Sequence, residues 1–417
     1  MTEEESGQPA PAGESMGEPP AAAAEAKTEP QSASGAIQFT GDGSAYFGIW
    51  IVNLVLSIVT LGFYSPWAKV RRLRYFYGHT LVDGSPFDFH GSPIAILRGR
   101  IAALLMVGAY TQTAKFSVSL WFVVVAVLVA IAPWMAWKSL RFRLGNTSYR
   151  GVRFGFFGSL GDSYSTFLPL MLLFVLPGLV GAMAAMLLSD RGPRAMFALF
   201  GLFFLIATVL YPWLYFRMKR YQHANARCGE ARFSFSGTVK GSYAITLKMA
   251  GIVLAAIVVG ILAGAAGGFI LGALSRALGV APLALPGTGP GAGPRADSMI
   301  AGVGGALIGY LVVLSTFPIA SAFTQNYVWG GTGLASAPFR SEVGALALWR
   351  IQLVNAVMLV VTLGLYWPYA LVRATRYRLS CMSWSGDAAA IAAQEPDAAV
   401  GASGEEAMEL FGFDLSL

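Results

Sequence analysis

A short unit that recurs along the chain constrains the fold more than any other feature of the sequence. The unit opens on a Pro-aromatic pair, continues with several basic residues, and closes on an alternating F-x-F-x-G segment. Residues 65–91 align without a gap with 132–158 and 211–237, and weaker copies cover 317–339 and 367–387. Because internal copies are typical of proteins built from one supersecondary unit, we expect a repeat architecture.

Each part of the unit predicts a local structure. Proline lacks an N–H and clashes with the preceding turn, so Pro66, Pro133 and Pro212 should end or kink an apolar helix. The tryptophan after each proline suits a membrane interface. The alternating segment predicts a short β-element, and these elements should pair with one another because an isolated strand leaves its edge unsatisfied. Two recurring aromatic positions are expected in the core: Tyr75, Phe142 and Tyr221, and then Phe87, Phe154, Phe233 and Phe339.

The composition indicates a protein with several membrane spans. The chain is 55% hydrophobic and only 12% charged, whereas soluble domains carry about 25% charged residues. Apolar stretches lie near 47–64, 94–111, 118–137, 167–188, 196–216, 246–274, 300–323 and 344–371. Several reach the roughly 20 residues that a helix needs to cross a bilayer. No basic segment leads into an early apolar run, so we expect no secretory signal peptide.

Charge divides the chain into three parts. Residues 1–36 hold seven acids and one base, and residues 385–417 hold seven acids and no base. We expect both to be disordered acidic tails, through which protein partners can bind. Residues 37–384 form the basic, repeat-built transmembrane domain. Its charge favours membrane lipids, and anionic headgroups in particular, over nucleic acid, although the bases also serve to set the topology.

The basic residues place the repeated units in the cytoplasm by the positive-inside rule. Two intervals, 41–66 and 339–368, are too short for two spans, which need ~40 residues. We therefore expect an all-α polytopic membrane protein of repeated helical hairpins with short cytoplasmic β-elements. It has six full spans plus two re-entrant or short helices, and both termini are cytoplasmic. The alternative has eight spans and moves one set of bases, Arg373, Arg376 and Arg378, to the other side.

The two short hairpins carry the first candidate site. Each combines an asparagine, a threonine, a glycine and a tyrosine around the expected break, namely Asn53, Thr60, Gly62 and Tyr64, and then Asn355, Thr362, Gly364 and Tyr366. Paired broken helices form the substrate site in transporters built from repeats. The structural alternative is that these residues only satisfy and bend the interrupted backbone.

A cationic set is the second candidate, for contact with anionic lipid headgroups or for topology alone. It consists of Arg71, Arg72, Arg74, Arg141, Arg143, Arg217 and Arg220. The two cysteines form no CxxC pair and the three histidines lack the spacing of metal ligands, so we expect neither a metal nor another cofactor. No acid–base set converges, which argues against an enzyme.

Three stretches resemble a known family: "TLGFYSPWAKVRRLRYFYGHT", "SLRFRLGNTSYRGVRFGF" and "TLGLYWPYALVRATRYRL". They are similar to the YjgN-like family of bacterial inner-membrane proteins, and the resemblance covers about residues 37–384. It departs in the two acidic tails and in the Gly/Pro-rich loop 282–297. The resemblance implies a multi-pass protein of the bacterial inner membrane and supplies no activity, cofactor or catalytic residue.

Two functions remain open from the sequence. The first is a transport or permeation protein with a pseudo-symmetric centre, for which a polar cavity should reach Asn53 and Asn355. The second is a membrane scaffold or anionic-lipid-interacting protein with a basic cytoplasmic platform. Few carboxylates lie in the apolar stretches, which weakens a proton-coupled transporter. The sequence leaves the substrate and the oligomeric state open.

Overall fold

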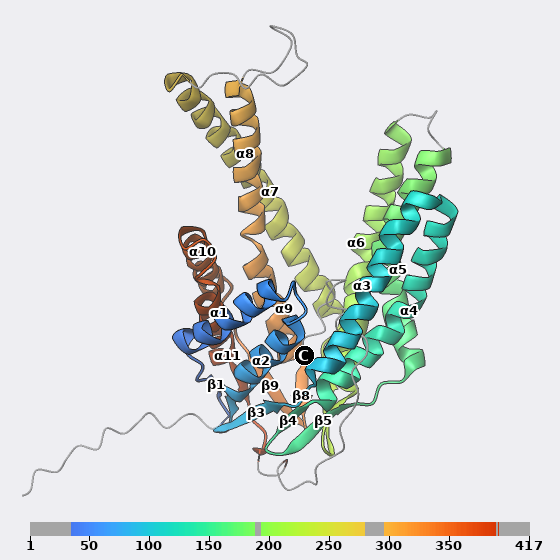
Figure 1. Ribbon diagram of the computed structural model, residues 1–417, viewed down its shortest axis with the longest axis vertical. Helices are drawn as coiled ribbons and strands as arrows, with labels where there is room; N and C mark the ends of the chain where they lie inside the picture. Colours follow the sequence, from blue (N-terminus) through green and yellow to red (C-terminus); the bar gives the residue numbers. More distant parts are fainter. Residues whose placement is uncertain (1–34, 188–192, 280–295, 389–390, 392–417) are drawn as a thin grey trace, which may run out of the picture. The chain divides into compact units, whose positions relative to one another are not determined.

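The computed structural model describes residues 35–187, 193–279, 296–388 and 391 (Figure 1). Strands alternate with groups of helices in one order throughout. The strands are β1 (Ile37–Phe39), β2 (Thr80–Val82), β3 (Ser85–Phe89), β4 (Thr147–Tyr149), β5 (Val152–Phe156), β6 (Ala226–Cys228), β7 (Ala231–Phe235), β8 (Thr332–Leu334), β9 (Ala337–Ser341) and β10 (Met382–Trp384). The expected acidic tails and the 282–297 loop lie largely outside the described residues.

A pair of helices separates most successive pairs of strands, and three helices lie between β7 and β8. The helices are α1 (Gly43–Val59), α2 (Ser65–Gly78), α3 (Pro93–Phe116), α4 (Val118–Gly145), α5 (Leu160–Leu187), α6 (Pro193–Ala224), α7 (Val239–Ala277), α8 (Ala296–Leu314), α9 (Phe317–Gly330), α10 (Ala345–Val361) and α11 (Trp367–Ser380). The order strand, helices, strand therefore recurs five times along the described chain.

The ten strands form one sheet in which each strand pairs antiparallel with the next in sequence. The two edges also meet, because Ala36 bridges Ser383 and the Trp384 N–H donates to the Gly35 carbonyl at 2.8 Å. The sheet thus nearly closes into a barrel, which leaves little free strand edge. The expected all-α class needs correction on this point, since the short β-elements make a continuous sheet.

Two-residue turns with positive φ join the strands within each hairpin. Asp83 and Arg150 have φ of 47° and 50°, and each precedes a glycine that also has positive φ. Two successive positive φ angles are the requirement of the type I′ turn, whose twist matches that of the flanking strands. The turns therefore set the register of β2 with β3 and of β4 with β5.

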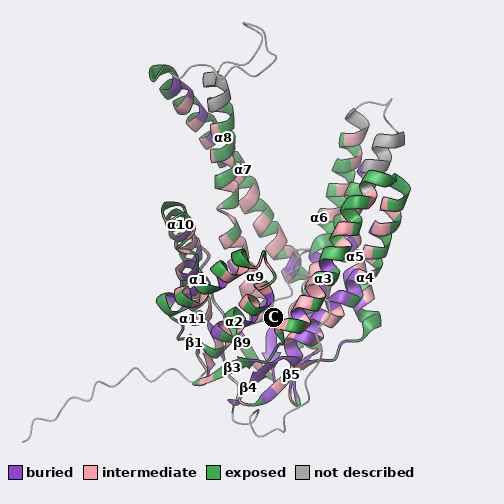
Figure 2. Ribbon diagram, viewed as in Figure 1, coloured by how far each residue is buried: buried purple, intermediate pink, exposed green. Residues whose placement is uncertain are grey.

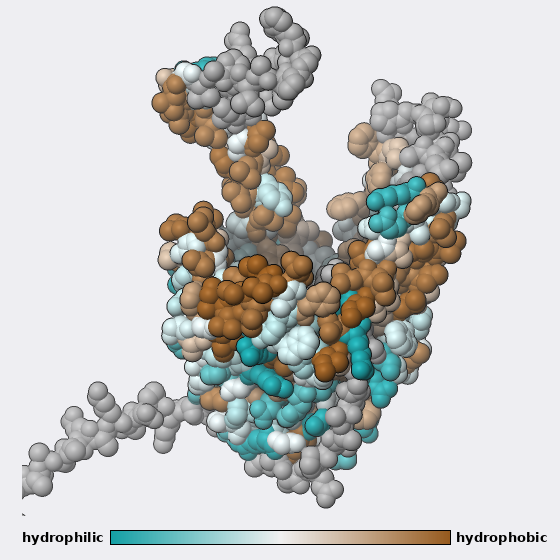
Figure 3. Space-filling model, in the orientation of Figure 1, coloured by the Kyte–Doolittle hydropathy of each residue, from teal (hydrophilic) through white to brown (hydrophobic). Residues whose placement is uncertain are grey.

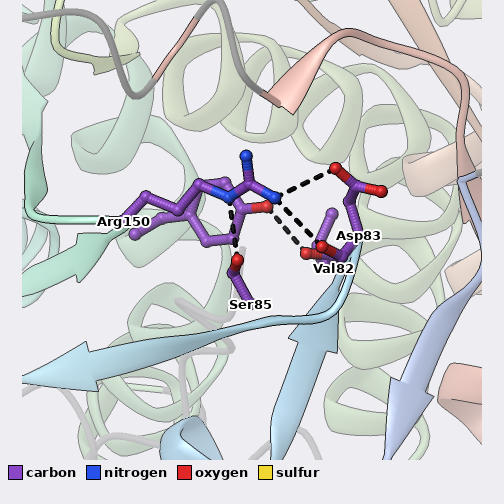
Figure 4. Close-up of polar contacts among 5 residues, drawn as sticks. Val82, Asp83, Ser85 and Arg150 are labelled. Carbon is purple, nitrogen blue, oxygen red and sulfur yellow. Dashed lines mark hydrogen bonds and ion pairs between the residues drawn. The ribbon is translucent and has the colours of Figure 1, made fainter. Parts of the chain in front are cut away.

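Neighbouring turns are tied together by side chains (Figure 4). The Arg150 guanidinium donates to Oδ2 and to the main-chain oxygen of Asp83, both at 3.0 Å, and its Nε donates to Ser85 Oγ at 2.8 Å. The Tyr149 hydroxyl donates to the Val82 carbonyl at 2.7 Å. Burial raises the pKa of Tyr149, so this hydroxyl stays protonated and remains a donor.

The helices close a ring above the sheet. The last helix of each group packs on the first helix of the next: α2 on α3, α4 on α5, α6 on α7, α9 on α10, and finally α11 on α1. Within a group, a recurring tyrosine fastens the second helix to the start of the first. Tyr75 donates to the Asp42 carbonyl at 2.7 Å, and Tyr221 donates to the Ser159 carbonyl at 2.8 Å. Phe142 takes the same place without a hydroxyl, and all three aromatic side chains are buried as expected.

Six helical segments are long and apolar enough to cross a membrane, in agreement with the six full spans expected. They belong to α3, α4, α5, α6, α7 and the α8–α9 stretch. Buried residues gather at the sheet and the adjoining helix ends (Figure 2). Hydrophobic residues cover the far parts of the helices, and hydrophilic residues surround the sheet (Figure 3). Such a separation of hydrophobic from hydrophilic residues is expected when the ends of the helices far from the sheet are surrounded by lipid.

The helices α1 and α10 are shorter, at 17 residues each, and both end at an abrupt turn. At Gly62 and Gly364 the backbone has φ of 91°, in each case after a leucine that also has positive φ. The chain then reverses, so that α1 packs on α2 and α10 packs on α11. Leu61 and Leu363 at the turns are 92% and 93% exposed, which leaves two apolar tips on these hairpins.

Candidate functional site

An aromatic ladder follows the inside of the sheet. Its members come from β3, β5, β7, β9 and β10, with ring centroids 6.1, 6.1, 6.3 and 5.9 Å apart along the series Phe87, Phe154, Phe233, Phe339 and Trp384. The four phenylalanines occupy the same position in their units, because F-x-F alternation directs that residue toward the axis of the sheet. The same hydrophobic cluster contains Ala388 and Ile391, each 2% exposed. Residues that follow β10 in the chain therefore pack with the aromatic ladder inside the sheet.

A cavity of about 460 Å³ lies against this ladder. We call it the central cavity, because strands from around the sheet and the ends of α2, α4, α6, α9 and α11 all contribute to its lining. Aromatic and aliphatic side chains dominate. The polar exceptions are Arg143, Arg378, His223, Gln325, Thr80, Thr147 and Thr375, and none of the described lining residues is an aspartate or glutamate. The lining is therefore apolar with a cationic part.

The two arginines that line the central cavity occupy aligned positions in the segments 132–158 and 367–387. Arg143 lies in the last turn of α4, and Arg378 lies in the last turn of α11. Cations are stabilised at helix C-termini by the helix dipole. Arg378 also donates to Ser321 Oγ at 2.7 Å, while its carbonyl accepts from Gln325 Nε2 at 3.4 Å. The sequence analysis found Arg143 but used Arg378 only to weigh the topology.

Two buried polar side chains have no partner among the described residues. The indole Nε1 of Trp384, which lines the central cavity, donates to nothing. Neither amide atom of the fully buried Gln222 has a partner, and this residue shares its place in the unit with Arg143 and Arg378. Buried polar groups are nearly always hydrogen-bonded, so the Trp384 indole offers a donor to a polar ligand in the central cavity, whereas Gln222 does not line that cavity.

His223 and Cys228 bring the other reactive groups to the central cavity. His223 Nδ1 lies 3.0 Å from Thr332 Oγ1, which itself donates to the Val328 carbonyl at 2.7 Å. Burial raises the pKa of the Cys228 thiol to about 12, so the thiol is neutral and a weak nucleophile. Within the described ranges, no three His, Cys, Asp or Glu side chains are grouped to hold a metal ion.

The candidate threonines, glycines and tyrosines lie at the two helix breaks. Thr60 Oγ1 donates to the Leu56 carbonyl at 2.7 Å and accepts from the Tyr64 N–H at 3.0 Å. Thr362 makes the same pair of bonds with Met358 and Tyr366, at 2.7 and 3.0 Å. These contacts satisfy the interrupted backbone, which is the structural role considered for them.

Both candidate asparagines are buried. Asn355 is 1% exposed, and its Nδ2 donates to the Ala370 carbonyl of α11 at 3.3 Å. Asn53 is 7% exposed, and its Oδ1 has no partner among the described residues. Neither asparagine lines the central cavity. The structure therefore associates Asn355 with the contact between α10 and α11.

The cationic candidates separate into three groups. Arg143 lines the central cavity. Arg71, Arg141 and Arg217 stack over the rings of Tyr64, Trp137 and Trp213, with 5.8, 4.8 and 4.9 Å to the centroids. Arg72, Arg74 and Arg220 are exposed. The stacked and exposed members lie on the helices nearest the sheet, beside the predicted membrane interface.

The fold and cavity define a class of protein: a multi-helix membrane protein whose helical hairpins stand on one nearly closed sheet. Residues 34–410 match the model of a family described as bacterial protein of unknown function (DUF898), and the chain belongs to that family. The predicted YjgN-like resemblance is confirmed by curated relatives that carry this name. No solved structure matches the chain.

Two of these relatives are named inner membrane protein YjgN. The one from Salmonella typhimurium is 36% identical over 140 residues, which are 32% of this chain and 35% of the relative. The one from Escherichia coli O157:H7 is 32% identical over 137 residues, which are 32% of this chain and 34% of the relative. The aligned part thus spans about a third of each relative's length.

Proposed function

We propose that the protein resides in the bacterial inner membrane and binds an anionic amphiphile, of the kind a membrane phospholipid represents, in its central cavity. The observation that carries the proposal is the lining of that cavity. Aromatic and aliphatic side chains offer a surface for apolar chains, while Arg143 and Arg378 offer charge and hydrogen bonds to an anionic head. Its volume of about 460 Å³ lies in the range of ligand pockets, ~300–1,000 Å³.

The topology we propose has both termini in the cytoplasm, three transmembrane hairpins, and two re-entrant hairpins formed by α1–α2 and α10–α11. The apolar tips Leu61 and Leu363 support shallow insertion, because a 17-residue helix that turns back leaves its apolar end in lipid. The basic helices α2, α4 and α6 then lie at the cytoplasmic interface, where anionic headgroups attract them. The names of the relatives support the inner membrane.

The recurring order of elements supports a pseudo-symmetric centre, and we place that centre on the axis of the sheet. A transport path between Asn53 and Asn355 has less support, because both asparagines are buried and neither lines the cavity. Binding of an amphiphile needs only the cavity itself. It also agrees with the basic platform that the sequence predicts for a lipid-interacting protein.

Lipid analysis of the purified protein tests this function. The protein, extracted in mild detergent, should carry anionic phospholipid that survives delipidating washes, detected by native mass spectrometry. The double variant Arg143→Gln/Arg378→Gln should lose most of it, since a hydrogen bond to a charged group contributes about 1.5–3 kcal/mol. The matched control Arg72→Gln/Arg220→Gln removes two exposed charges and should retain it. Equal retention in wild type and the cavity variant would contradict the proposal.

A further inference from the structure

A second cavity of about 470 Å³ lies between α6, α7 and α9. We call it the side entrance and define it by Tyr211 and Lys219 of α6, Thr246 and Met249 of α7, and Phe317 and Ser321 of α9. Three further residues of its lining, Gln325, Trp329 and Arg378, also line the central cavity. The two cavities therefore share a wall.

The side entrance coincides with the copy of the repeated unit that departs most from the others. Where the first unit has Lys69, Arg72 and Leu73, the copy in α9 has Ser321, Thr324 and Gln325. Ser321 and Thr324 put smaller, uncharged side chains on the face of α9 that lines the side entrance, and Gln325 puts a polar side chain of similar size in place of leucine. The copy that lacks the basic residues is thus also the one that has a cavity beside it, between α6 and α9.

Two cationic side chains line the side entrance, and one of them, Arg378, also lines the central cavity. Lys219 is 2% exposed, and its Nζ lies 5.9 Å from the centre of the Tyr215 ring. Arg378 extends from α11 to donate to Ser321 Oγ at 2.7 Å, on the α9 wall. No described residue in the lining of the side entrance is an aspartate or glutamate. An anionic group at this junction therefore meets two cations, and the lining offers it no like charge.

The other end of the side entrance lies at the level of the Pro-aromatic pairs. Tyr211, which precedes Pro212 in α6, is 37% exposed, and Phe317, which precedes Pro318 in α9, is 75% exposed. Tyrosine side chains such as that of Tyr211 gather at membrane interfaces, where the ring contacts lipid and the hydroxyl contacts water. The side entrance therefore runs from the expected headgroup level of the bilayer to the cationic junction.

We infer that the side entrance is the route by which a membrane phospholipid reaches the central cavity, and that Lys219 and Arg378 receive its anionic headgroup at the junction. This inference rests on the proposed function, since it assumes that the central cavity holds an amphiphile. The acyl chains follow the apolar residues Ile245 and Met249 of α7. The phosphate moves past Gln325 to the junction, and no covalent step is involved.

Loading of a fluorescent anionic phospholipid from vesicles tests the route. The purified wild-type protein in nanodiscs should take up labelled phosphatidylglycerol, with energy transfer to the probe from the native tryptophans. Thr246→Trp fills the side entrance and should abolish rapid loading without changing the final occupancy of the central cavity. The matched control Thr111→Trp places the same bulk in the groove between α3, α4 and α5 and should load at the wild-type rate.

Lys219 has its own readout, the preference for an anionic over a zwitterionic probe. Lys219→Gln should reduce this preference by about 10-fold or more, because a charged hydrogen bond contributes about 1.5–3 kcal/mol, whereas Lys219→Arg should keep it.

If the wild type takes up no lipid, the proposed function fails. If it loads and Thr246→Trp loads equally fast, the route is wrong and the function stands. An unchanged preference in Lys219→Gln overturns the headgroup assignment.

Discussion

At the scale of single residues, position along the helix separates the half-buried arginines of the cavity from the exposed ones. Arg143 and Arg378 fall on the same step of their units and both reach the central cavity, whereas Arg72 falls one turn earlier and is exposed. The sequence predicts that these helices are basic. It does not identify the inward face, because the direction of each helix depends on neighbours that come from distant parts of the chain.

A chemical probe of Cys228 tests the wall of the central cavity. The thiolate is the form that reacts with maleimide. Burial raises the pKa of Cys228 to about 12, so the thiol stays neutral as the pH rises from 7 to 9. In a Cys381→Ser background, native protein should resist N-ethylmaleimide over this range and react fully after denaturation in detergent.

The complementary variant supplies the control for this probe. Cys228→Ser leaves Cys381, which is half-buried, and should react in the native state. Rapid labelling of Cys228 in native protein, with a rate that levels off above about pH 8.5, would mean an exposed thiol of ordinary pKa, and the cavity wall would then be open to solvent.

At the scale of elements, the sequence predicts more of the helices than of the sheet. The breaks near Gly62 and Gly364 are foreseen because glycine permits the positive φ found there. The β-elements are also foreseen, but not their union into one sheet. Each strand has only three or five residues, and so short a segment carries no signal for which distant strand pairs with it.

The packing of α7 against α8 yields a prediction about small residues. A Cβ on Gly264 would lie 2.5 Å from the Gly305 carbonyl oxygen, whereas a Cβ on Gly251 of the same helix meets nothing within 4 Å. Close approach through small residues is typical of membrane helices. Gly264→Ala should destabilise the protein by about 1–3 kcal/mol through overpacking. Gly251→Ala should be neutral or stabilise it by about 0.5–1 kcal/mol.

Thermal unfolding in detergent, followed by fluorescence, measures both glycine variants. Both substitutions add the same methyl group to the same helix, so a difference between them reports the contact with α8. An equal melting temperature for Gly264→Ala and Gly251→Ala would show that the two helices are not in contact at Gly305.

At the scale of the whole molecule, the closure of the sheet and the path of the last hairpin depend on Ser383. This residue pairs with Arg340 of β9 and forms the bridge with Ala36 next to β1. Because β9 precedes α10 and β10 follows α11, the pairing with Arg340 requires that this helical hairpin begin and end on the same side of the membrane. The bridge with Ala36 joins the two ends of the sheet, which lie almost 350 positions apart in the chain.

Disulfide trapping at Ser383 separates the re-entrant hairpin from a straight span. In a background without native cysteines, Arg340→Cys/Ser383→Cys should form a disulfide with a mild oxidant, because paired strand residues lie within the Cα distance that a disulfide needs, roughly 4.4–6.8 Å. Ala36→Cys/Ser383→Cys should also form one if the sheet closes. The control Ser234→Cys/Ser383→Cys joins β7 with β10, which are not paired, and should stay reduced. A straight α10–α11 span would hold Arg340 and Ser383 about 30 Å apart across the bilayer, so failure of the first pair alone would overturn the re-entrant topology and the ring of hairpins that depends on it.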